Sequence, residues 1–193
     1  LVIAPKLSDT VNLRLIKTSA GGAYDASAYV VALEAEHNVN LHDTEIAAEG
    51  FLDLTVAAGD VHMQNVGINQ GGEINLTVGS GAIYMDSVDV SGTLDMTTGG
   101  GDITMDDVDV SGSMSADTRA GNIAMNDVDV SSGGVLAVTS GQGDVTVDQV
   151  SSDGTLQITA ENGSLLMKDE ESILNIGEHS TLTEGNTWVD ING

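Results

Sequence analysis

Aspartate side chains recur at matching places along the middle of the chain, and theirs is the chemistry most easily named. One set follows an apolar pair, a second stands between two valines, and both return every 20 to 22 positions. Carboxylate oxygens are ligands that Ca²⁺ prefers, and stacked carboxylates repel one another unless a cation offsets the repulsion. No cofactor is therefore expected to be required, and the columns raise the hypothesis that Ca²⁺ binds between coils at Asp86, Asp89, Asp106, Asp107, Asp109, Asp127 and Asp129.

A solvated acidic surface is the alternative interpretation of these residues. Diffuse counter-ions would then screen the carboxylates without any specific site. The calcium-binding nonapeptide GGxGxDxUx is missing, and so is the ligand spacing of an EF-hand loop. The calcium hypothesis depends on the stacking of the aspartates alone.

Other site chemistries find less support in the sequence. His42 and His62 fall at different positions of the repeat, so they do not stack and no zinc site is expected. Only Arg119 is basic between residues 18 and 167, and the repeat length varies by two residues, which leaves no long loop to wall a cleft. We therefore expect no catalytic residues and no enzyme activity.

The elements that must position the aspartates are short strands in an internal repeat. The strings GAIYMDSVDVSG, GDITMDDVDVSG and GNIAMNDVDVSS begin at residues 81, 101 and 121. Each copy holds two apolar pairs with period-two spacing, and a third pair such as Leu94/Met96 follows a glycine. Hairpins give no reason for like residues to return at a fixed period, whereas stacked coils do. Glycine is expected to supply unusual backbone angles at the corners.

This pattern predicts an all-β, single-domain parallel β-helix with three short strands per coil. Each coil has 20 to 22 residues, and a right-handed winding is favoured because parallel crossovers are right-handed in ordinary sheets. We expect regular coils over residues 37–165, divergent coils or a cap over 1–36, and an irregular coil or cap over 166–193. The ends of such a coil need protection because they expose unpaired strands.

Composition limits the partners. The chain has 193 residues, 30 acidic against 5 Lys and Arg, and no cysteine, so its formal net charge is −25. A field of that sign repels nucleic acid and anionic lipid, and no apolar stretch is long enough to span a membrane. Aromatic residues make up 3% of the chain, which favours a core of similar aliphatic side chains.

Coils of the form GDITMDDVDVSGSMSADTRA resemble the repeats of filamentous-haemagglutinin-type adhesins, over roughly residues 37–165. The resemblance implies a secreted or surface-attached bacterial rod, and it assigns no catalytic residues. We therefore expect a stiff acidic shaft of an extracellular adhesin or a self-assembling surface filament, with copies or adjoining repeats stacked head to tail. A surface module that binds calcium or host or matrix glycans is the first alternative, and a polysaccharide-cleaving β-helix enzyme is the second.

Overall fold

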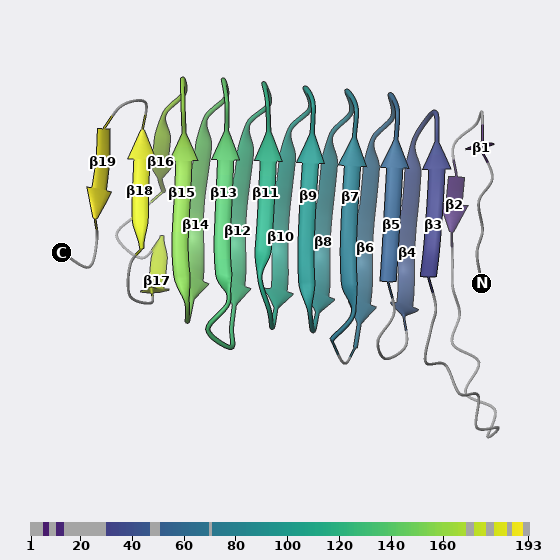
Figure 1. Cartoon of the computed structure of the whole chain (residues 1–193), viewed down its shortest axis with the longest axis horizontal. Coiled ribbons are helices and arrows are strands. Elements are labelled where there is room, and N and C mark those ends of the chain that lie inside the picture. Colours follow the sequence, from purple (N-terminus) through teal and green to yellow (C-terminus); the bar gives the residue numbers. More distant parts are fainter. Residues whose placement is uncertain are drawn as a thin grey trace.

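The computed structural model describes residues 6–7, 11–13, 30–46, 51–69, 71–168, 172–176, 180–184 and 187–190. In these residues the secondary structure is entirely β, and two parallel sheets stack as a solenoid of about six turns. Figure 1 shows the two sheets face to face, with the N-terminal coils at one end of the long axis and the C-terminal coils at the other. The chain winds in a right-handed sense, as the sequence predicted.

One sheet has ten strands. Its order is β1 (Lys6–Leu7), β3 (Val30–Ala35), β5 (Phe51–Val56), β7 (Glu73–Val78), β9 (Thr93–Thr98), β11 (Met114–Thr118), β13 (Val135–Ser140), β15 (Thr155–Ala160), β18 (Thr181–Glu184) and β19 (Thr187–Asp190). All neighbours are parallel except β18 and β19, which pair antiparallel.

The other sheet has nine strands. Its order is β2 (Val11–Leu13), β4 (Val39–Ile46), β6 (Val61–Ile68), β8 (Ile83–Val90), β10 (Ile103–Val110), β12 (Ile123–Val130), β14 (Val145–Ser152) and β16 (Leu165–Met167), and β17 (Ile173–Ile176) also pairs with β14. Successive strands of this sheet lie one coil apart in the sequence, and every pair is parallel.

Equivalent residues of neighbouring coils pair directly. Ile103 lies between Ile83 and Ile123, and the methionines two positions further along pair in the same way. The predicted stacking of like side chains is therefore confirmed. Because neighbouring strands in a sheet lie about 4.8 Å apart, a side chain in a middle coil lies next to the equivalent side chain of the coil on each side.

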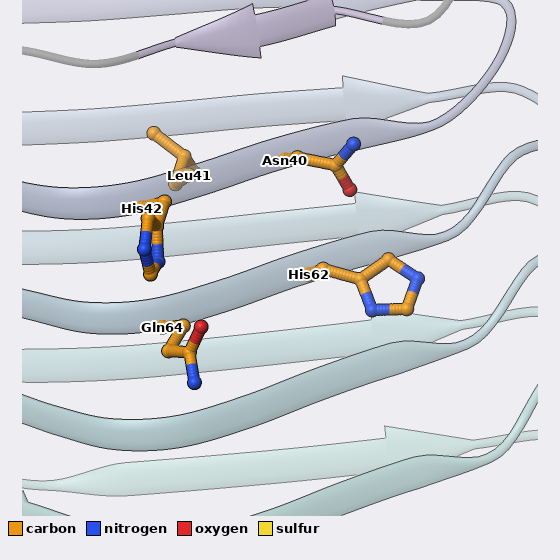
Figure 2. A pocket seen from close by; sticks show the side chains of 5 residues that line it. All are labelled: Asn40, Leu41, His42, His62 and Gln64. Atoms are coloured by element: carbon orange, nitrogen blue, oxygen red, sulfur yellow. The ribbon is translucent and has the colours of Figure 1, made fainter.

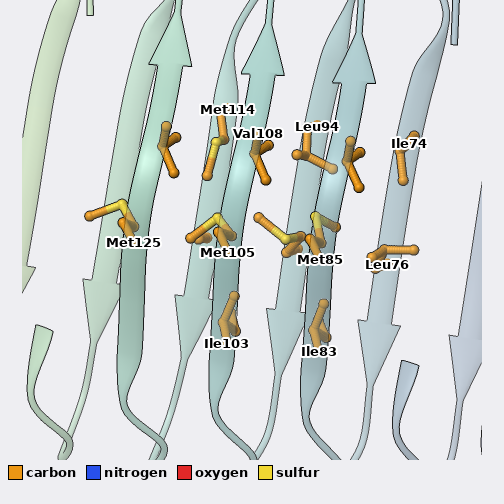
Figure 3. Close-up of a cluster of buried hydrophobic side chains, with 14 of the residues drawn as sticks. Ile74, Leu76, Ile83, Met85, Leu94, Ile103, Met105, Val108, Met114 and Met125 are labelled. Carbon is orange, nitrogen blue, oxygen red and sulfur yellow. The ribbon is translucent and has the colours of Figure 1, made fainter. Parts of the chain in front are cut away.

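The core is a buried column of aliphatic and methionine side chains between the two sheets. Figure 3 shows Met85, Met105 and Met125 side by side in this column, with Ile83 and Ile103 in a parallel row. These side chains are at most 2% exposed. Burying one of them contributes about 1.5–3 kcal/mol, so the repeated column supplies the main stabilising term.

The coil differs from prediction in having two strands rather than three. The first two expected strands form one strand of eight residues, such as β10, which bends at Asp107. Burial along β10 alternates on both sides of the bend but two successive residues, Asp106 and Asp107, face outward. The inward-facing positions thus shift by one residue at the bend, and a single residue in a left-handed conformation makes this shift possible. We call this bend the crease; it is formed by Asp43, Asn65, Ser87, Asp107, Asp127 and Gln149, with φ between 49° and 57°.

The glycines before each long strand act by close approach rather than by backbone angle. A Cβ added at Gly101 would lie 2.0 Å from the carbonyl oxygen of Gly81, and one at Gly121 would lie 2.0 Å from that of Gly101. Among the described glycines, φ is positive at Gly71 and Gly133. The expectation of unusual glycine angles at this bend is therefore wrong, because the coils stack too closely there for any side chain. We call the bend that precedes each long strand the glycine corner; it is formed by Gly59, Gly81, Gly101, Gly121, Gly143 and Gly163.

Buried hydroxyl groups join the coils at the glycine corner. The Thr118 hydroxyl donates to the carbonyl of Gly101 at 3.0 Å and accepts from the backbone N–H of Gly121 at 2.9 Å. Thr98 and Ser140 make the same bridges one coil before and one coil after. Each hydroxyl satisfies two backbone groups that the close stacking has removed from water.

The two ends of the described chain differ from its middle. Most of residues 1–36 lie outside the described residues, while β1, β2 and β3 pair within the same two sheets. At the other end β16 has three residues, β17 pairs with β14 through a register shift, and β19 reverses direction. The regular alternation of the sequence also fades after residue 165.

Candidate functional site: the acidic face of the nine-stranded sheet

The predicted aspartates lie on the outer face of the nine-stranded sheet, at the middle of its long strands. Asp106 pairs with Asp86, and Asp109 pairs with both Asp89 and Asp129. The remaining two, Asp107 and Asp127, occupy the crease on adjacent strands. All seven residues therefore come together as three neighbouring columns, as the repeat predicted.

The first column combines carboxylates with hydrogen-bond donors. The Gln64 side-chain amide donates to Asp86 at 2.8 Å, and the Asn126 amide donates to Asp106. At the end of the column, the Lys168 ammonium lies 2.7 Å from a carboxylate oxygen of Asp148. Sequence analysis did not include Gln64 or Lys168, although both fall in register with the aspartates. In this column much of the repulsion between carboxylates is offset by the chain itself.

The crease column is only partly compensated. The Asn65 amide donates to Asp43 at 3.0 Å, and the Ser87 hydroxyl donates to Asp107 at 3.0 Å. Asp107 and Asp127 then occupy equivalent positions on successive strands. Two unit charges about 5 Å apart in water repel by about 1 kcal/mol, so this step of the column opposes folding.

The third column carries the least compensated charge. Ser151 donates to Asp129 at 2.6 Å, but within the described residues no side-chain donor contacts Asp89 or Asp109. Burial raises the pKa of Asp109 above its ordinary value of 3.8, and the carboxylates of Asp129, Asp89, Asp107 and Asp127 raise it further. These five residues define the acidic cluster: Asp89, Asp107, Asp109, Asp127 and Asp129.

The acidic cluster lies on an open sheet face. In the part of the chain that the structure describes, no three His, Asp or Glu side chains are grouped so as to hold a metal ion. The cluster thus offers cations a strong negative potential and an array of oxygen atoms rather than a closed ligand cage. Specific Ca²⁺ binding stays a prediction.

A shallow hollow lies nearer the N-terminal end of the same sheet. Figure 2 shows its lining side chains on β4 and β6, where the ring of His62 extends away from His42. His62 stacks on Tyr84 with ring centroids 4.6 Å apart, and His42 lies 3.4 Å from Asp43. The two imidazoles fall in different columns, as predicted, and do not converge on a common point. The lining consists of Asn40, Leu41, His42, His62 and Gln64.

Comparison of the chain with protein-family models, with curated proteins and with solved structures finds no match. The fold and its surface therefore carry the functional argument. Among the described residues, no helix is long and apolar enough to cross a membrane.

Proposed function

We propose that this chain is a structural shaft, either part of an extracellular bacterial adhesin or a subunit of a surface filament. The observation that carries the proposal is the uninterrupted pairing of equivalent residues from β4 through β14 and from β3 through β15. Bending such a rod would have to break ladder hydrogen bonds and open the aliphatic column at once. The proposed role is mechanical and non-catalytic.

The charge of the surface supports the same role. The chain has a net charge of −25, and its buried core is made mainly of apolar side chains from both sheets. Rods with that surface repel one another sideways, which keeps them separate and soluble. The resemblance of the repeat to filamentous-haemagglutinin-type coils supports placement outside the cell.

Protease treatment of intact cells that produce the protein tests the location. We expect antibody-detected chain to be lost or shed while a cytoplasmic control protein persists. Retention of the chain until the cells are lysed would overturn the extracellular assignment. Resistance of the purified chain to the same protease after mild heating would separately support the stiff shaft.

Divalent-cation binding is the second candidate function, and the acidic cluster favours it. Burial and the neighbouring carboxylates raise the pKa of Asp109, and a cation between Asp109 and these neighbours would relieve the repulsion among them. We expect the thermal midpoint to rise in Ca²⁺ relative to EGTA, and the rise to shrink in the Asp109→Asn variant. Asp117→Asn, on the ten-stranded sheet, is the matched control for the lost charge. Equal midpoints in Ca²⁺ and EGTA would remove this candidate.

A further inference from the structure

One asparagine of the described chain stands directly before a residue of the glycine corner. Asn162 precedes Gly163, and among the described residues no other asparagine precedes a glycine. Stacking fixes the glycine, because a Cβ at Gly163 would lie 2.1 Å from the carbonyl oxygen of Gly143. The positions before the other corner glycines hold Ala58, Ser80, Gly100, Ala120 and Gln142.

An Asn-Gly step can react within itself. The backbone nitrogen of Gly163 attacks the side-chain carbonyl carbon of Asn162, and glycine carries no side chain to hinder the approach. A bond forms between this nitrogen and Asn162 Cγ, while the Asn162 amide group leaves with the Gly163 proton as ammonia. Water then opens the cyclic imide at one of its two carbonyl groups, which gives aspartate or isoaspartate.

The glycine corner restrains the equivalent nitrogen in three other coils. There the backbone N–H of the corner glycine donates to a buried hydroxyl three residues earlier, at 2.9–3.1 Å. In the coil of Gly163 that position is Ala160, which pairs with Ser140 in the ten-stranded sheet. Alanine has no hydroxyl, so this restraint is missing at Gly163. The restrained pairs are Gly101 with Thr98, Gly121 with Thr118 and Gly143 with Ser140.

The Asn162 side chain lies on the outside of the corner, where water reaches it. It is exposed, and it lies between β15 and β16 rather than in the ladder of either sheet. Its amide nitrogen donates to the carbonyl oxygen of Gly141 at 2.6 Å. This bond keeps the side chain beside the corner backbone, and it engages the amide nitrogen rather than the carbon that Gly163 attacks.

We propose that Asn162 is a site of spontaneous modification in the folded chain, where ring closure onto Gly163 yields aspartate and isoaspartate. In isoaspartate the main chain runs through the former side chain, which adds one backbone carbon, about 1.5 Å of chain. The coils approach most closely at this corner, and two residues later Leu165 pairs with Val145. The added length therefore loosens β16 from β14. The modification does not depend on the shaft function.

Incubation of the purified, folded chain in mildly alkaline buffer, followed by peptide mapping with mass spectrometry, tests the site. We expect Asn162 to convert before the other described asparagines, with both products present. The rate should increase with pH, because the attacking species is the deprotonated amide nitrogen. A free peptide of residues 160–165 is the reference for the unfolded chain. If the peptide converts while Asn162 of the folded chain does not, the proposal is wrong.

Variants at position 160 test the missing hydroxyl. Ala160→Ser restores the bridge to the Gly163 N–H and should slow the conversion by about fivefold, the effect of one net hydrogen bond. Ala160→Val is the matched control, because Val56 and Val78 occupy the equivalent position in two other coils. It should convert at the rate of the unmodified chain. Equal rates in the serine and valine variants would overturn the role of the bridge.

Hydrogen exchange of the β16 amides separates the two products. Asn162→Asp carries the same added charge with an ordinary backbone, so it should keep the protection of β16. The isoaspartate form, isolated from aged protein, should lose that protection because its backbone is longer. Equal exchange in the two forms would contradict the proposed loosening, and Asn162→Gln, whose attack requires a larger ring, should remain unmodified throughout.

Discussion

Each coil changes direction at the glycine corner and again at the crease, and the two bends are built in opposite ways. At the glycine corner, backbones of successive coils approach so closely that a Cβ at Gly121 would overlap the carbonyl oxygen of Gly101. At the crease, residues such as Asp127 adopt a left-handed conformation with their side chains exposed. Space is limiting at the first bend, and backbone angle is limiting at the second.

The difference shows why glycine marks the first of these two bends and not the second. A left-handed conformation costs an ordinary residue about 1–2 kcal/mol, which Asp and Asn tolerate best. An overlap with a backbone atom of the neighbouring coil cannot be relieved by a side-chain rotation. The glycine corner is therefore specified by stacking between coils, and the crease is specified by local conformation and polarity.

The largest effect is expected from filling the glycine corner. Gly121→Ala should destabilise the chain by about 3 kcal/mol, because two coils must move apart to admit the methyl group. Gly100→Ala is the matched control, since a Cβ there meets nothing within 4 Å. Urea unfolding followed by circular dichroism measures both. Equal stability of the two variants would contradict the close approach of the coils.

Removing the buried hydroxyl beside the glycine corner should have the next largest effect. Thr118→Val keeps the shape of the side chain but leaves the Gly101 carbonyl and the Gly121 N–H without their bridge. We expect a loss of about 2 kcal/mol in the free energy of unfolding. Thr118→Ser retains the hydroxyl and should lose less. If valine proves as stable as serine, the bridge is not a stabilising contact.

Protonation should relieve the repulsion at the acidic cluster. Because the Asp109 pKa is raised in the folded state, that state binds more protons than the unfolded chain between pH 3.8 and the raised pKa. The contribution of Asp109 to stability therefore increases as the pH falls through this window. Asp109→Asn should be more stable than the unmodified chain at pH 7, and this advantage should diminish towards pH 4.

Asp117→Asn provides the control for that experiment, because it removes one charge from the exposed face of the ten-stranded sheet. Thermal melts of the three chains at several pH values separate a local effect from a change in net charge. A constant advantage of Asp109→Asn from pH 7 to pH 4 would be inconsistent with protonation of this carboxyl group.

The smallest effect is expected at the crease. Gln149→Gly, at a neutral crease position, removes the left-handed penalty of about 1 kcal/mol but adds about 0.5 kcal/mol of backbone entropy to the unfolded chain. The net gain should be about 0.5 kcal/mol. Gln149→Val should destabilise, because a β-branched residue tolerates positive φ poorly. A valine variant as stable as the glycine variant would contradict the assigned backbone conformation.

The sequence predicted most of the coil because its repeat reports stacking directly. Equal residues at Ile83, Ile103 and Ile123 have to be neighbours in a solenoid, and the alternation around them identifies which side faces the core. The two-strand coil could not be predicted, since period-two patterns on either side of Asp107 look like separate strands. Only the backbone angle at the crease shows that they form one bent strand.

The candidate site was predicted as a set of columns but not in its electrostatic detail. Spacing alone placed the aspartates in register. The donors that compensate them, such as Gln64 and Asn126, depend on side-chain orientation, which the repeat does not determine. The uneven compensation that leaves Asp109 the most perturbed carboxyl follows from those contacts.

Distances between spin labels on one column of outward side chains test the central claim, the in-register stacking of coils. Labels at Thr55 paired in turn with labels at Asp117, Thr139 and Thr159 lie three, four and five strands apart in the ten-stranded sheet. At about 4.8 Å per strand, the backbone separations should be about 14, 19 and 24 Å. A linear increase supports the solenoid, and separations that fail to grow with the number of coils would contradict it.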